Sequence, residues 1–150
     1  MFLDKTLEEL DGENWGEPTF QSTLVLECHR ARRIPLKDFT DEDLRRLIGQ
    51  KFSLDYVVPL ALMRLVNEPF CGDWYPGDVL DAVLSLPLSF WDGHPQLRQS
   101  IDMIVVMAIK KYEVNEDLHL EVDDQVLARL KKHTAGSLAK SIRPCRERHG

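Results

Sequence analysis

The sequence lacks the short motifs that mark the most common catalytic and ligand-binding loops. It contains no GxxxxGK or GxGxxG phosphate loop, and no HExxH, GxSxG or EF-hand pattern. It also has no apolar run close to the roughly 18 residues of a membrane span, and its first segment, MFLDKTLEELDGENWGEP, lacks the features of a secretory signal. We therefore expect a cytoplasmic protein that does not associate with membranes.

Residues that bind metals are equally sparse. The chain has three cysteines and no CxxC pair, which argues against a disulfide framework and against a zinc site. No two of the five histidines lie three or four residues apart. Asp73, Asp78 and Asp81 offer the oxygen ligands that magnesium takes, but each also suits a turn or the first turn of a helix. We expect no metal, no cofactor and no enzymatic activity, and a small hydrolase built on these aspartates is kept as a further alternative.

What the chain has in abundance is helical periodicity. Thr40 and Asp43 form a capping-box pattern before the apolar positions of DLRRLIGQ, and Pro95 opens a long segment with apolar residues on one side. SFWDGHP is expected to form a turn, and only LHLEV alternates like a strand, with no second strand to pair with. The pattern predicts an all-α fold, a single compact domain over residues 1–150 with about six to eight short helices. The basic tail over residues 137–150 is expected to fray.

The net charge of −6 conceals a strong asymmetry along the chain. Residues 1–128 hold 12 basic and 24 acidic side chains, whereas residues 129–150 hold 7 basic and 1 acidic. Acidic surface repels nucleic acid and speeds the encounter with basic proteins. We therefore expect a basic protein as the partner rather than nucleic acid, although high acidity also serves solubility.

The stretch CGDWYPGDVLDAVL, from Cys71 to Leu84, places acids and aromatic rings around a Pro-Gly turn. Tryptophan and tyrosine are enriched at the energetic centres of protein interfaces, and FWDGH offers a second turn of this kind. The same rings can instead close the core at helix junctions, and Asp78 and Asp81 can simply favour the start of a helix. The residues themselves leave both readings open.

Several ordered segments resemble those of immunity proteins from bacterial contact-dependent growth inhibition (CDI) systems. They are KTLEEL followed by NWGEP, then STLVLECHRARRIPLKDFTDEDLRRLIGQ, VVPLAL and DWYPGDVLDAVL. The resemblance extends over roughly the first two thirds of the chain, to about Trp91. It implies a small cytoplasmic protein that binds the toxic C-terminal domain delivered by a neighbouring cell. Such toxins are commonly nucleases and often basic, so the implied partner is a basic nuclease domain, bound one to one, whose active site or substrate access is blocked.

Within this resemblance, toxin binding is assigned to one candidate set, whose members are Asp73, Trp74, Tyr75, Asp78, Asp81, Trp91 and Asp92. We expect Asp73, Trp74 and the Trp91–Asp92 turn to reach outward, and YPGD to form the architectural corner. Four acidic clusters compete with this set: Glu8, Glu9, Asp11 and Glu13; Asp41 and Glu42; Glu113, Glu116 and Asp117; Glu121, Asp123 and Asp124. The alternative function is an acidic interaction or regulatory module whose basic tail touches nucleic acid. The sequence indicates no oligomeric state.

Overall fold

Helices account for all of the regular secondary structure in the residues that the structure describes. The computed structural model describes residues 2–19 and 22–135. The α-helices are α1 (Leu7–Asp11), α2 (Thr23–Ala31), α3 (Asp41–Gly49), α4 (Leu54–Asn67), α5 (Asp78–Leu84), α6 (Leu88–Asp92), α7 (Pro95–Val114) and α8 (Glu116–Glu121). Two short 3₁₀ helices, Phe2–Asp4 and Leu36–Asp38, precede α1 and α3, and residues 124–135 form a further helix. The all-α prediction is confirmed.

Two details differ from the sequence-based expectation. SFWDGHP contains the helical turn α6, which follows an extended Pro87 at its N-cap, where a simple turn was expected. With helix 124–135 included, the described part of the chain therefore has nine α-helical segments, just above the expected range. LHLEV, the one strand-like stretch, lies mostly in α8, where the Asn115 side chain accepts a hydrogen bond from the backbone N–H of Asp117.

Capping chemistry sets the start of α1 and, as the Thr40–Asp43 pattern predicts, the start of α3. The Thr6 and Thr40 hydroxyls each accept a hydrogen bond from the backbone N–H three residues on, and the side chains at those positions accept from the two threonine N–H groups. Each cap stabilises its helix by about 1 kcal/mol. The capping Asp43 is also buried and pairs with Arg30 at 2.6 Å, so the first turn of α3 is tied to α2.

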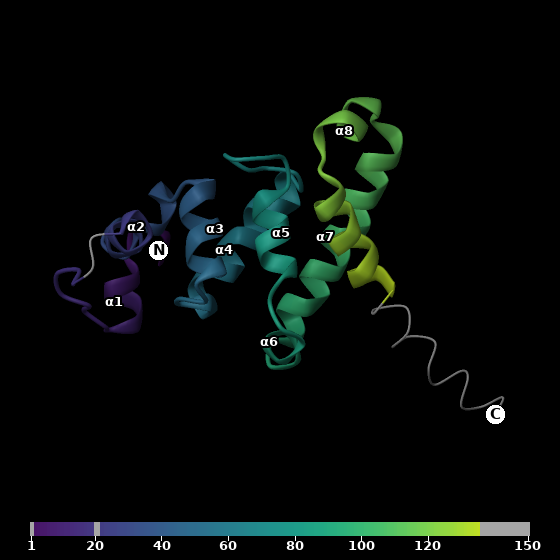
Figure 1. The fold of residues 1–150 in the computed structure, drawn as a ribbon. Helices are drawn as coiled ribbons and strands as arrows, with labels where there is room; N and C mark the ends of the chain where they lie inside the picture. The colour runs from purple at the N-terminus through teal and green to yellow at the C-terminus, as the bar shows by residue number, and fades with distance from the viewer. Residues whose placement is uncertain (1, 20–21, 136–150) are drawn as a thin grey trace.

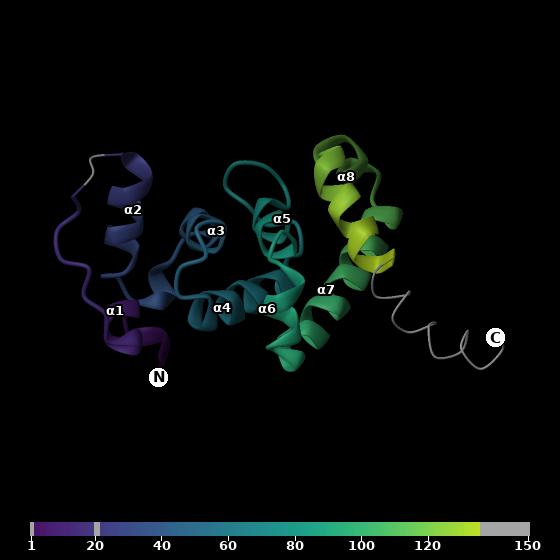
Figure 2. The same ribbon diagram turned by 60° about the horizontal axis from the view of Figure 1, so that its bottom comes forward.

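The helices follow one another across the molecule, from the N-terminal end to the last described helix (Figure 1). α3 and α4 lie between α2 and α5, and α7 follows on the other side of α5 in both ribbon views (Figure 2). The buried apolar side chains form one connected cluster that extends from Leu7 in α1 to Leu130 in helix 124–135. This continuity supports the single-domain organisation, which stays a prediction.

A buried arginine fixes the N-terminal helices to one another. Arg32 follows α2, is almost completely buried, and contacts Asp11 through two nitrogens at 2.9 Å each. The guanidinium also donates to the Ser53 hydroxyl and lies 4.4 Å from the ring centroid of Trp15. Burial raises the pKa of Asp11, but hydrogen bonds, the strongest of them from Arg32, lower it further, so the pKa lies below its usual value. Asp11 is therefore engaged inside the protein and is not a free surface charge.

Two predictions concern other parts of the chain. The basic tail over residues 137–150 lies outside the described residues. Among the residues that are described, no helix combines the length and the apolar character needed to cross a membrane.

Candidate functional site

The loop between α4 and α5 forms the corner that YPGD was expected to build. Gly77 adopts a left-handed backbone conformation with φ of 87° at the N-cap of α5, and its N–H donates to the carbonyl oxygen of Phe70 at 3.0 Å. A side chain at this position would also press against Val126, whose methyl lies 3.1 Å from an ideal Cβ. Glycine is therefore required both by the backbone and by the packing.

Asp78 shapes this corner from the inside. The side chain is only 1% exposed, and its Oδ2 accepts hydrogen bonds from the backbone N–H groups of Trp74 at 2.9 Å and Tyr75 at 3.4 Å. The carboxylate packs against Gly72, where any Cβ would collide with it. Burial raises the pKa of Asp78 despite these two hydrogen bonds. Asp78 is therefore placed to hold the loop, not to touch a partner.

Asp81 ties the corner to the last described helix. It is 6% exposed, and its Oδ2 accepts hydrogen bonds from the Tyr75 hydroxyl at 2.9 Å and from Gln125 at 3.1 Å. Its other oxygen pairs with Arg129. Burial, reinforced by the hydrogen bond to Asp81, raises the pKa of Tyr75 to about 12. Asp81 and Tyr75 thus join the corner, α5 and helix 124–135.

Asp73 and Trp74 do reach outward, as predicted. Trp74 is 69% exposed, and the guanidinium of Arg45 lies 4.5 Å from its ring centroid. Arg45 is itself held by two hydrogen bonds to Glu42 on the same helix. Asp73 is exposed and accepts a hydrogen bond at 3.1 Å from the backbone N–H of Glu42, in the first turn of α3. The Trp74 ring is therefore presented to solvent in a fixed position.

Trp91 and Asp92 divide between core and surface. The expectation that Trp91 reaches outward is wrong: its side chain is 4% exposed and packs edge-on against Phe90, with ring centroids 5.0 Å apart. The cause is α6, which turns the ring into the core where an open turn would have exposed it. Asp92 remains at the surface and pairs with Arg98 at 2.9 Å.

Within residues 2–19 and 22–135, no group of three or more His, Cys, Asp or Glu side chains is arranged to hold a metal ion. The three aspartates of the corner instead serve three separate structural contacts, to α3, to the loop backbone and to helix 124–135.

Comparison with known protein families identifies the chain. Residues 9–101 match the model of a family described as CDI immunity proteins. The chain belongs to this family. The match agrees with the resemblance noted from the sequence and supports an immunity function against CDI toxins. No curated protein matches the chain.

The matched range of this immunity protein includes the corner and ends inside α7. Beyond it lies a second surface, which we call the α7–α8 tip, formed by residues 113–124. In Figure 1 the tip projects at the top of the molecule, where α7 ends and α8 begins. Its acidic side chains are all exposed: Glu113, Glu116, Asp117, Glu121, Asp123 and Asp124. None of these six forms an ion pair with a basic side chain of the described residues, whereas Asp41 and Glu42 pair with arginines.

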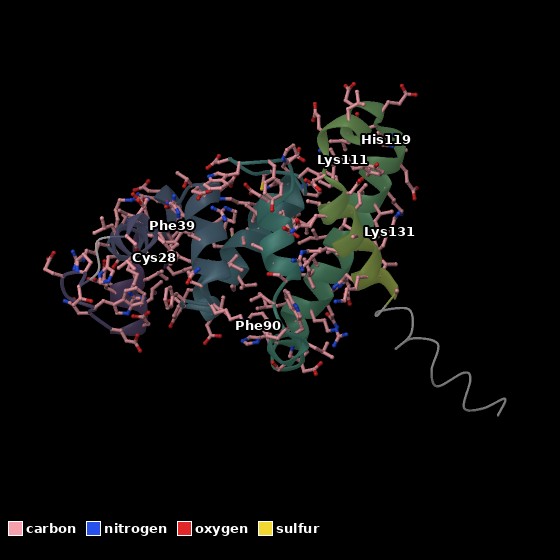
Figure 3. All side chains as sticks on the ribbon, in the orientation of Figure 1. Cys28, Phe39, Phe90, Lys111, His119 and Lys131 are labelled. Atoms are coloured by element: carbon pink, nitrogen blue, oxygen red, sulfur yellow. The ribbon has the colours of Figure 1, made fainter. Side chains whose placement is uncertain are left out.

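The tip also exposes apolar surface that sequence reasoning missed. Val114 is 84% exposed and Leu120 is 90% exposed, while Leu118 between them is buried. The ring of His119 packs on Tyr112, with centroids 4.4 Å apart, and its Nε2 lies 2.9 Å from the Tyr112 carbonyl oxygen, which closes the turn (Figure 3 labels His119). The alternation of Leu118 and Leu120 was the signal, because two leucines two apart on a short helix cannot share a face.

Proposed function

We propose that this immunity protein binds a basic nuclease toxin domain one to one in the cytoplasm and blocks its active site or the path of its substrate. It acts by binding and carries out no reaction of its own. The family match supports the immunity part of this proposal. The acidic character of residues 1–128 supports the basic partner, because opposite charge speeds association and carboxylates can occupy positions where a nuclease expects phosphates.

The observation that carries the proposal is the α7–α8 tip. Carboxylates that are already paired inside a protein contribute little to a partner's binding, and many of the acidic groups near α1 and α3 are paired in this way. The six carboxylates of the tip lie in the same short segment as Val114 and Leu120, which are the two most exposed large apolar side chains in the described residues. Apolar contacts at the centre with charges at the rim are the usual anatomy of a protein interface.

The second part of the proposed surface is the Asp73–Trp74 segment. The loop that bears it and the tip both lie along the upper edge of the molecule in Figures 1 and 2. Exposed tryptophans held by neighbouring side chains are frequent energetic centres of interfaces. A toxin domain that buries about 800 Å² on each partner is of the size that can cover both.

Co-expression tests the function directly. The toxin candidate is the C-terminal domain encoded directly upstream of the gene for this protein, expressed alone and together with the protein. We expect the domain alone to stop growth and degrade nucleic acid, and the pair to grow normally and co-purify at equal stoichiometry. Growth arrest without nucleic-acid damage would contradict the nuclease, while absence of a complex would contradict neutralisation by binding.

Charge reversal at the tip tests the proposed surface. Glu116→Lys with Asp117→Lys is expected to slow association with the toxin by tenfold or more at low salt and much less at high salt, because steering by charge is screened. The matched control is Glu13→Lys with Asp38→Lys, an equal charge change at exposed carboxylates that form no ion pair with a basic side chain of the described residues. Equal losses from both double variants would show that only net charge matters and would remove the tip from the interface.

The alternative, a module whose tail touches nucleic acid, is tested by a gel-shift assay. The full chain and a version ending at Gly136 are compared with the same nucleic acid. Binding that requires the tail would favour the alternative, whereas binding by neither version would exclude it.

A further inference from the structure

A cavity of about 430 Å³ opens between the α5–α6 turn, the first turn of α7 and helix 124–135. Four basic side chains line it: Arg98, Arg129, Lys132 and His133. Its apolar wall includes Leu88, which is half-exposed, and the buried Trp91. No aspartate or glutamate of the described residues is among its lining. The titratable side chains of the lining are thus basic, in contrast to the acidic body of the protein.

Three of the four basic groups are held in place by carboxylates that lie outside the lining. Arg98 pairs with Asp92 at 2.9 Å, His133 with Asp102 at 2.6 Å, and Arg129 with Asp81. A guanidinium has several N–H donors arranged as a planar fork, and each of these pairs engages only one nitrogen of its arginine. Neither arginine pairs with a second carboxylate of the described residues, so the remaining N–H groups can donate to a ligand.

Lys132 is different from the other three. No carboxylate of the described residues pairs with it, although it lies beside an acidic protein body that offers many. Its ammonium group is exposed, so it can meet an anion that enters the cavity without first giving up an ion pair to a described carboxylate. The two paired arginines then add directional hydrogen bonds to the same anion.

We propose that this cavity binds a small organic anion, a carboxylate or monophosphate group attached to an apolar body. The anionic group would lie among Lys132 and the two arginines, and the apolar body against Leu88 and the wall formed by Trp91. Pockets that bind small molecules have this composition, mostly apolar lining with a few converging polar groups. Such a site is separate from the α7–α8 tip and from Trp74, so it adds a ligand to a protein otherwise expected to bind only a toxin.

Calorimetric titration of the full chain tests the proposal with three probes. Phenyl phosphate and benzoate carry the anion on an aromatic body, and benzyl alcohol carries the body without the charge. We expect the two anions to bind at one site with Kd on the order of 0.1 to 1 mM, and benzyl alcohol at least tenfold more weakly. Inorganic phosphate serves as a fourth arm that separates recognition of the charge from recognition of the apolar body.

Two lysine variants supply the matched comparison. Lys132→Gln removes a cation from the lining without breaking an ion pair, so we expect a loss of fivefold or more in affinity with no change in unfolding temperature. Lys131→Gln removes the same charge from the next residue, which is exposed and does not line the cavity (Figure 3 labels Lys131). It should change affinity by less than twofold. Equal losses in the two variants, equal binding of benzyl alcohol, or no binding of either organic anion would overturn the proposal.

Discussion

The buried carboxylate of Asp81 allows the sharpest test of the fold. It accepts hydrogen bonds from Tyr75 and Gln125 and pairs with Arg129, so one side chain connects the α4–α5 loop to helix 124–135. If this connection organises the C-terminal half, Asp81 variants should unfold more easily while the surface that meets the toxin keeps its chemistry. Stability and toxin affinity therefore need to be measured on the same proteins.

The magnitude follows from the partners that Asp81 leaves behind. Removing one member of a fully buried ion pair costs about 3–5 kcal/mol, and a hydrogen bond to a charged group contributes about 1.5–3 kcal/mol. Arg129 is 37% exposed, so water can replace part of the lost carboxylate. We expect Asp81→Ala to lower the free energy of unfolding by about 3 kcal/mol and Asp81→Asn, which keeps an acceptor for Tyr75, by about 1–2 kcal/mol.

Urea unfolding followed by circular dichroism measures both variants. Glu121→Gln removes an exposed carboxylate that pairs with no basic side chain of the described residues, and should change stability by no more than about 0.5 kcal/mol. An Asp81→Ala protein within that same range would refute the role assigned to the carboxylate. A large loss of toxin affinity by folded Asp81→Asn would instead show that the side chain belongs to the interface.

Three further predictions concern the corner. Trp74→Ala should weaken toxin binding by about 2 kcal/mol in titration calorimetry and change the free energy of unfolding in urea by less than about 1 kcal/mol, because the ring is exposed and rests on Arg45. A large loss of stability with little loss of binding would show that the ring serves only the fold. Gly72→Ala should lower the free energy of unfolding by about 2–3 kcal/mol, since the added Cβ would collide with Asp78 and the Tyr75 carbonyl. The control Gly49→Ala, where the space around the added Cβ is open, should leave the protein equally or more stable; thermal melts compare the two variants. Burial raises the pKa of Asp78 in the folded protein, so the wild type loses stability as the pH rises from about 4 through the folded pKa. The stability of Asp78→Asn relative to wild type, measured as the free energy of unfolding, should therefore be more favourable at about pH 7 than at about pH 4. A stability difference that does not change with pH would contradict this.

Local signals in the sequence were sufficient for the fold class and for the corner. The capping boxes at Thr6 and Thr40 depend only on residues three apart, and the turn at Gly77 depends on a residue that tolerates positive φ. These interactions form within a single segment, so their residue pattern identifies them directly. The same holds for the helical spacing of α7.

Which side chains are buried and which are exposed could not be predicted in the same way. Trp91 lies in the core because α6 forms and packs on α7, and the residues of FWDGH alone suit an open turn equally well. The pairing of Asp81 with Arg129 joins positions 48 residues apart, and no spacing rule relates them. Exposure of Val114 and Leu120 similarly depends on how α8 folds back on α7. Each of these results needs tertiary packing, which one sequence does not specify by pattern.

The proposed division between scaffold and interface rests on which carboxylates are bonded within the protein and which are not. Inside the range that matches the CDI immunity family, Asp11, Asp43, Asp78 and Asp81 are bonded to arginines or to backbone N–H groups of the protein itself. Breaking these contacts to bind a toxin would expose partners left behind without compensation. Beyond residue 101, the tip has exposed carboxylates that pair with no basic side chain of the described residues, in the same segment as the exposed Val114 and Leu120. If the toxin binds at the tip as proposed, the partner could change there without altering the corner, which is the arrangement expected if one immunity fold serves against different toxins.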